Sequence, residues 1–305
     1  MYKNIFLKYL LSNNPDEVIS KGGVQLRKKF AKQLINMAKP TVNYKLKVID
    51  EYKKPESDQP LIFACTHSFK DDFIFSVKTF REHGYVIFGS LPQFFNTFDG
   101  IGAWLLGSIL VDRTNKESRN AVIPKAEKVN EYGANTYWFP EGGWNNSPNK
   151  LASHLWPGVN VFAKKTGNLI VPNATYPFDD TVYSTVGQPL NMTEHSLEEA
   201  NQILRDTFAT LNYDLIEAAA PAVLRSSLPD PKTALNDWEE EIKARYSVVK
   251  YLDPEEEKRT LYIPKELRHY EEYQDCFLYK SENFSDRLEN EAKSLEEQKT
   301  LKLKK

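Results

Sequence analysis

The sequence is poor in cysteine and has no long apolar run. Its two cysteines, Cys65 and Cys276, suggest no disulfide framework and favour a reducing compartment. A bilayer-spanning helix needs roughly 20 apolar residues, and the longest candidate, residues 100–111, is too short. The apolar N-terminal stretch, residues 5–11, is interrupted by Lys8 and is followed by no small-residue cleavage site. We therefore expect a soluble or surface-attached protein.

An excess of one charge is also missing. Forty basic and forty-two acidic side chains give a net charge of −2, whereas a dedicated nucleic-acid-binding protein usually has a basic excess. We therefore expect no nucleic-acid partner. The sequence also lacks the G-x-S-x-G, P-loop, H-E-x-x-H and paired C-x-x-C motifs, and we predict no metal site.

Glycine and charge divide the 305 residues into three predicted zones. Residues 1–45 form a basic amphipathic helical segment, because residues 1–40 hold eight Lys or Arg and apolar residues at near-helical spacing. Such a helix lies either on an anionic membrane or against the domain with a solvated basic face. Residues 46–225 form the central domain. No glycine follows Gly187, and residues 226–305 read as a charged helical extension.

The central zone alternates short apolar runs with amphipathic stretches. The runs predict buried strands at residues 61–65, 85–88, 109–111, 136–139 and 169–171. The stretches between them predict helices at residues 72–82, 117–131 and 159–165. Alternating strands and helices over more than 100 residues predict an α/β fold, with a sheet covered on both faces.

Polar residues follow the first predicted strand, where α/β folds place their ligands. Ser68 and Asp71 have the spacing of a capping box at the start of the next helix. His67 then lies outside the helix, and Asp72 can reach one imidazole nitrogen and leave the other as a base. Asp71 is the rival orienting residue. The alternative is a surface histidine beside an acidic helix start.

Cys65 precedes His67 by two residues, so both side chains point to the same face of a strand. A cysteine nucleophile with a histidine base is one interpretation. Buried strand cysteines are usually inert packing, and we favour that structural role.

Two further polar groups follow predicted strands. Arg113 ends the segment 107–113 and suits a phosphate group, the alternative being a surface pair with Asp112. Residues 138–144 run from a strand into a Pro-Glu-Gly-Gly turn, whose glycines allow the backbone to approach a ligand closely. Glu141 in that turn either contacts a hydroxylated or cationic ligand group or simply closes the turn.

Together these blocks resemble the glycerolipid acyltransferases of the lysophosphatidic acid acyltransferase type. Four family motifs are matched in order: H-x-x-x-x-D by His67 and Asp72, an apolar strand ending in arginine by residues 107–113, F-P-E-G by residues 139–142, and an apolar strand closed by proline by residues 171–172. Four motifs in order within about 110 residues are specific. The resemblance implies a mixed, largely parallel sheet covered by helices and makes residues 46–225 the acyltransferase domain.

The resemblance also implies the chemistry. An acyl chain would move from a thioester, acyl-CoA or acyl carrier protein, to a hydroxyl acceptor such as lysophosphatidate, with His67 as base and Asp72 holding the imidazole. The acceptor site would comprise Arg113, Glu141, Gly142 and Gly143. No metal or tightly bound cofactor is implied. We expect a cytoplasmic protein that attaches peripherally to the cytoplasmic face of an anionic membrane.

The third motif departs from the family pattern. Gly143 and Trp144 stand where the family has threonine or serine and then arginine, so one hydroxyl and one cation are missing. A glycan, an amino-lipid or another hydroxylated acceptor therefore stays open. Two other functions also stay open: a catalytically idle lipid- or partner-binding protein on the same fold, and a thioesterase or hydrolase that uses His67 with water or Cys65.

Overall fold

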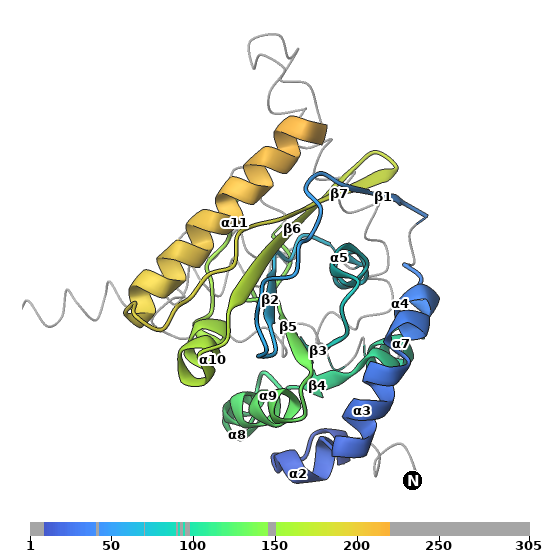
Figure 1. Cartoon of the computed structure of the whole chain (residues 1–305), viewed down its shortest axis with the longest axis vertical. Coiled ribbons are helices and arrows are strands. Elements are labelled where there is room, and N and C mark those ends of the chain that lie inside the picture. Colours follow the sequence, from blue (N-terminus) through green and yellow to red (C-terminus); the bar gives the residue numbers. More distant parts are fainter. Residues whose placement is uncertain are drawn as a thin grey trace, which may run out of the picture.

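The structure is a computed structural model of the 305-residue chain (Figure 1). It describes residues 9–40, 43–69, 71–89, 91, 94, 98–145 and 151–219, without the side chains of residues 98 and 99. The predicted C-terminal extension, residues 226–305, lies outside the described residues.

A seven-stranded sheet forms the centre of the described part. The strands are β1 (Lys45–Val48), β2 (Ile62–Cys65), β3 (Gly84–Phe88), β4 (Ser108–Leu110), β5 (Asn135–Trp138), β6 (Ile170–Phe178) and β7 (Thr181–Val186). Their order across the sheet is β1-β7-β6-β2-β5-β3-β4. The β6–β7 pair is antiparallel and every other neighbouring pair is parallel. The predicted fold class, a mixed and largely parallel α/β sheet, is confirmed.

Helices cover both faces of this sheet. They are α2 (Pro15–Val18), α3 (Lys21–Lys29), α4 (Ala31–Met37), α5 (Asp72–Phe80), α7 (Phe98–Leu106), α8 (Lys116–Asn120), α9 (Val122–Glu131), α10 (Gly158–Thr166) and α11 (Leu197–Ala219). Helices α9 and α10 pack on one face, α5 packs on the other, and α11 runs along β6 and β7 (Figure 1). Among the described residues, no helix is long and apolar enough to cross a membrane.

Two apolar cores fill the space between sheet and helices. In β2, Ile62 and Ala64 belong to the core beneath α9 and α10, whereas Phe63 and Cys65 belong to the core beneath α5. This alternation is the two-residue period of a strand. All four side chains are buried, as expected for a parallel strand covered on both faces.

The structure corrects several predicted boundaries. The last predicted strand does not stop at Pro172, because β6 continues to Phe178. Pro172 lies just before the ladder with β7, which begins at Asn173, so its missing N–H costs little there. The helix predicted over residues 117–131 is divided into α8 and α9 at Ala121. Strands β1 and β7 and helix α11 were not predicted.

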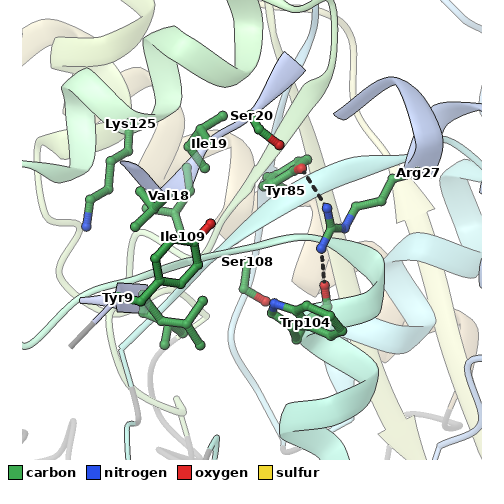
Figure 2. Close-up of a pocket in the computed structure, with 12 residues that line it drawn as sticks. Tyr9, Val18, Ile19, Ser20, Arg27, Tyr85, Trp104, Ser108, Ile109 and Lys125 are labelled. Atoms are coloured by element: carbon green, nitrogen blue, oxygen red, sulfur yellow. Dashed lines mark hydrogen bonds between the residues drawn. The ribbon is translucent and has the colours of Figure 1, made fainter. Parts of the chain in front are cut away.

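Over residues 15–37, the N-terminal segment forms the short helices α2, α3 and α4 and not one continuous amphipathic helix. Val24 of α3 is buried in the core on the α9 side, and Ile35 of α4 is buried in the core on the α5 side. The segment therefore passes around the β4 edge of the sheet and covers it. Arg27 fastens α3 to its neighbours, since its guanidinium donates to the Tyr85 hydroxyl and the Trp104 carbonyl (Figure 2).

A matched pair of substitutions in α4 tests this packing. Ile35 is 6% exposed and Met37 is 69% exposed. We expect Ile35→Ala to lower the free energy of unfolding by about 2–5 kcal/mol, because it leaves a cavity in the core. Met37→Ala should change it by less than about 0.5 kcal/mol. Urea denaturation measures both, and equally small losses would show that α4 does not pack on the domain.

Candidate active site

The predicted site residues follow the carboxyl ends of parallel strands. His67 follows β2, Glu141 follows β5 and Arg113 follows β4, so all three lie at one edge of the sheet. Strands β2 and β5 are neighbours, and β3 separates β5 from β4. The topology thus brings together residues that lie up to 74 positions apart in the sequence.

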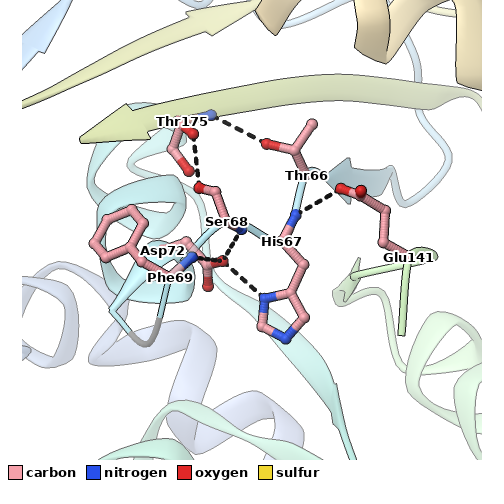
Figure 3. A network of polar contacts seen from close by, with 7 residues as sticks. All are labelled: Thr66, His67, Ser68, Phe69, Asp72, Glu141 and Thr175. Atoms are coloured by element: carbon pink, nitrogen blue, oxygen red, sulfur yellow. Dashed lines mark hydrogen bonds and ion pairs between the residues drawn. The ribbon is translucent and has the colours of Figure 1, made fainter. Parts of the chain in front are cut away.

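His67 and Asp72 are in direct contact. The imidazole Nδ1 lies 2.7 Å from Asp72 Oδ2 (Figure 3). The Asp72 side chain is 1% exposed, whereas the His67 side chain is 21% exposed. A carboxylate acceptor favours a proton on Nδ1, which leaves Nε2 with a free lone pair. The pair therefore has the geometry of a base and its orienting residue.

The same Asp72 oxygen also holds the loop that carries His67. It accepts the backbone N–H of Ser68 at 2.9 Å and that of Phe69 at 3.3 Å. The predicted capping box is wrong: α5 begins at Asp72, its N-cap Asp71 makes no side-chain cap bond, and the Ser68 hydroxyl donates to the Thr175 carbonyl. Asp72 thus holds the backbone of the loop and also orients the imidazole.

Glu141 holds the backbone of the same histidine. One carboxylate oxygen accepts the His67 N–H at 2.9 Å (Figure 3). The other accepts the Ser153 N–H at 2.9 Å. Burial raises the pKa of Glu141, and these two N–H donors oppose that rise. The His67 carbonyl accepts the Asn145 N–H at 2.6 Å. Glu141 therefore holds the His67 backbone, and its predicted place in the acceptor site stays a prediction.

The two glycines after Glu141 let the turn close beside aromatic rings. Gly142 has φ of +71°, and a Cβ there would lie 2.8 Å from the Trp156 indole. Glycine is required by both the dihedral angle and the space. Gly143 is half-buried and leads to Trp144, whose ring lies 6.1 Å from the His67 ring in an edge-on arrangement. The departure from the family motif therefore places an indole beside the histidine.

Arg113 lies at the end of the site away from His67. Its side chain runs so close to Gly89 that a Cβ there would be 2.2 Å from Nε. Asp112, the alternative partner for Arg113, accepts hydrogen bonds from the Thr114 N–H and hydroxyl instead. Among the described residues, the Arg113 guanidinium has no hydrogen-bond or ion-pair partner. Burial lowers its pKa to about 10, so it stays charged at neutral pH and suits an anionic ligand group.

Cys65 has the environment of a structural thiol. It is fully buried in β2, and burial raises its pKa, which disfavours the nucleophilic thiolate. No group of three His, Cys, Asp or Glu side chains suitable for a metal ion occurs within the described ranges.

Sequence reasoning missed three contributors to the site. Ser153 and Asn145 act through backbone N–H groups, which carry no side-chain signal. Trp144 was noted only as a departure from the family motif, and its contact with His67 depends on how the turn folds.

The comparison with family models identifies an acyltransferase domain in this chain. Residues 45–176 match the family model described as Acyltransferase. These residues form an acyltransferase domain. The predicted family and enzyme class, an O-acyltransferase, are thereby confirmed.

One solved structure with a similar fold is the 1-acyl-sn-glycerophosphate (LPA) acyltransferase, PlsC, from Thermotoga maritima. It is 15% identical over 72% of this chain and 89% of that chain, with a TM-score of 0.47. No curated protein matches the sequence.

Substitution of the two contact residues tests the predicted roles. We expect His67→Ala to abolish acyl transfer, and Asp72→Asn to lower the turnover about 10²–10⁴-fold, because the amide cannot stabilise the imidazolium. Asp71→Asn is the matched control and should lose less. Initial rates with a melting curve for each variant separate catalysis from folding. Near wild-type turnover by His67→Ala, or a larger loss in Asp71→Asn than in Asp72→Asn, would contradict the assignment.

Proposed function

We propose that the protein transfers an acyl chain from an acyl thioester to the hydroxyl of a lysophospholipid such as lysophosphatidate. The observation that carries this proposal is the 2.7 Å contact between His67 and the buried Asp72, at the same sheet edge as Arg113, whose guanidinium has no partner among the described residues. The acyltransferase family match supports the reaction class. The base and the unpaired cation together favour a phosphate-bearing alcohol as acceptor.

In this mechanism, His67 Nε2 takes the proton of the acceptor hydroxyl. The hydroxyl oxygen forms an ester bond with the acyl carbon, the carbon–sulfur bond breaks, and the thiol leaves with the proton of the imidazolium. Asp72 stabilises the imidazolium across the 2.7 Å contact. A positioned base supplies about 10²–10⁴-fold, and alignment of the two substrates supplies more.

Glu141 contributes to this alignment without touching substrate. Its carboxylate fixes the His67 N–H, and the Asn145 N–H fixes the His67 carbonyl, so the backbone of the base is held on both sides. Arg113 follows a strand two places beyond β5, which gives the acceptor's phosphate a place apart from its reacting hydroxyl. The donor is acyl-CoA or acyl carrier protein, and the proposed reaction needs no metal or tightly bound cofactor.

Product analysis separates this function from the alternatives. The full chain is incubated with palmitoyl-CoA and lysophosphatidate, and the products are identified by mass spectrometry, with His67→Ala as control. Phosphatidate and free CoA in equal amounts are expected. Free palmitate alone would indicate a hydrolase. No turnover with any lysophospholipid and either thioester carrier would indicate a binding protein.

Arg113 is expected to act on acceptor binding and not on the chemical step. A charged hydrogen bond to a phosphate contributes about 1.5–3 kcal/mol. Arg113→Ala should therefore raise the KM for lysophosphatidate about 10–100-fold and leave the KM for the thioester nearly unchanged. Steady-state kinetics with each substrate varied in turn measure both. An effect confined to the donor would place Arg113 at the phosphates of the thioester carrier instead.

We further propose that α3, α4 and α7 hold the active site at the cytoplasmic face of an anionic membrane. Exposed apolar side chains gather on these helices: Leu26, Phe30, Met37, Ile101, Trp104 and Leu105. Helix α4 packs against α7, and Arg27 ties α3 to the carbonyls of Trp104 and Leu105. Lys28, Lys29 and Lys32 add exposed positive charge. Apolar and basic side chains together are typical of a surface that binds anionic lipid.

Charge reversal tests this surface without removing packed residues. Each lysine near an anionic surface contributes about 1 kcal/mol, so Lys29→Glu with Lys32→Glu should weaken binding at least about tenfold. The assay is co-sedimentation with phosphatidylglycerol–phosphatidylcholine vesicles at low and high salt. Lys47→Glu with Lys53→Glu, at and just after the β1 end of the sheet, is the matched control. Equal loss in both double variants would contradict the assignment to α3 and α4.

A further inference from the structure

A cavity of about 190 Å³ lies beside the β3–β4 end of the sheet, apart from the His67 loop. Tyr85 of β3 and Ser108 of β4 line it from the sheet, Arg27 from α3, Trp104 from α7 and Lys125 from α9 (Figure 2). The sheet and helices on several sides therefore enclose a space that the acyl-transfer mechanism does not use.

Lys125 places an unpartnered cation at this cavity. The residue is 1% exposed, and its Nζ has no hydrogen-bond partner among the described residues. The other lysine of α9, Lys128, is more exposed and pairs with Asp16 and Glu131. An unpaired ammonium in the protein interior is costly, so its burial without a partner points to a missing anion.

A second cation, Arg27, lines the cavity, and no described acidic side chain pairs with either cation. Arg27 donates to the Tyr85 hydroxyl and to the carbonyls of Gly23, Trp104 and Leu105, all of them uncharged acceptors. Among the described residues that line the cavity there is no aspartate or glutamate. The net charge of the described lining is therefore positive.

The remaining lining limits the size and character of a ligand. Leu10, Val18 and Ile109 form apolar wall, beside the rings of Tyr9 and Tyr85. A cavity of about 150 Å³ accommodates benzene, so 190 Å³ has room for a small organic molecule. An oxyanion with a short apolar body matches both the charge and the wall.

We propose that this cavity is a binding site for a small organic anion, a carboxylate or a phosphate monoester on a short apolar body, with its oxyanion on Lys125 Nζ. The site is separate from the proposed acyl-transfer site. Burial lowers the pKa of Lys125 to about 8, so the amine is largely in its charged ammonium form at pH 7 and can pair with the anion.

Isothermal titration calorimetry with the full chain tests the proposal. The probes are hexanoate, butyl phosphate, inorganic phosphate and the uncharged hexanol. Lys125→Met removes the ammonium and keeps the side-chain volume, and Lys128→Met makes the same change on the same helix outside the cavity. We expect an organic anion to bind the wild type and Lys128→Met, and to bind Lys125→Met at least about tenfold more weakly.

The set of probes decides between the outcomes. Preference for hexanoate identifies a carboxylate site, and preference for butyl phosphate identifies a phosphate-ester site. Binding of inorganic phosphate alone, equal binding of hexanol, equal affinity in Lys125→Met, or no binding of either organic anion would overturn the proposal. Without ligand, Lys125→Met should melt at or above the wild-type temperature, because it removes an unpaired buried charge. A melting curve therefore shows whether a loss of binding reflects unfolding.

Discussion

The buried carboxylate of Asp72 is the interaction on which the site depends. One of its oxygens, Oδ2, accepts hydrogen bonds from the His67 ring nitrogen Nδ1 and from the backbone N–H groups of Ser68 and Phe69. A charge this deeply buried is tolerated only when it is hydrogen-bonded, so the loop between β2 and α5 folds around it. A shift of one residue along α5 would turn the carboxylate by about 100° around the helix axis and separate it from all three donors.

A second buried carboxylate completes the support of the histidine. Glu141 holds the His67 N–H and the Ser153 N–H, and thereby joins the carboxyl ends of two neighbouring parallel strands to the segment before α10. Asp72 fixes the ring, Glu141 fixes the backbone, and neither needs to touch substrate. The segment that matches the acyltransferase family model includes this histidine. The His67 side chain stays 21% exposed, with the Trp144 ring to one side.

The sequence was sufficient to locate strands β2 to β6 and the residues at their ends, and insufficient for contacts that depend on distant backbone. Apolar runs predicted β2 to β6 because buried parallel strands have little polar content. Strand β1 has only exposed and partly buried side chains, and β7 mixes partly buried with buried ones, so both carried a weaker signal. The pairing of His67 with Asp72 was predictable from their spacing. The role of Glu141 was not, because its partners are backbone groups whose positions depend on the fold of the turn after β5 and of the segment before α10.

The protonation of the His67 ring is the most direct test of the proposed base. Nitrogen-15 NMR of histidine-labelled protein, assigned by comparison with His67→Ala, reports which ring nitrogen carries the proton when the ring is neutral. We expect the proton on Nδ1, facing Asp72, and an unprotonated Nε2, with this preference lost in Asp72→Asn. A proton on Nε2 of the neutral ring in the wild type would contradict the assignment of His67 as the base.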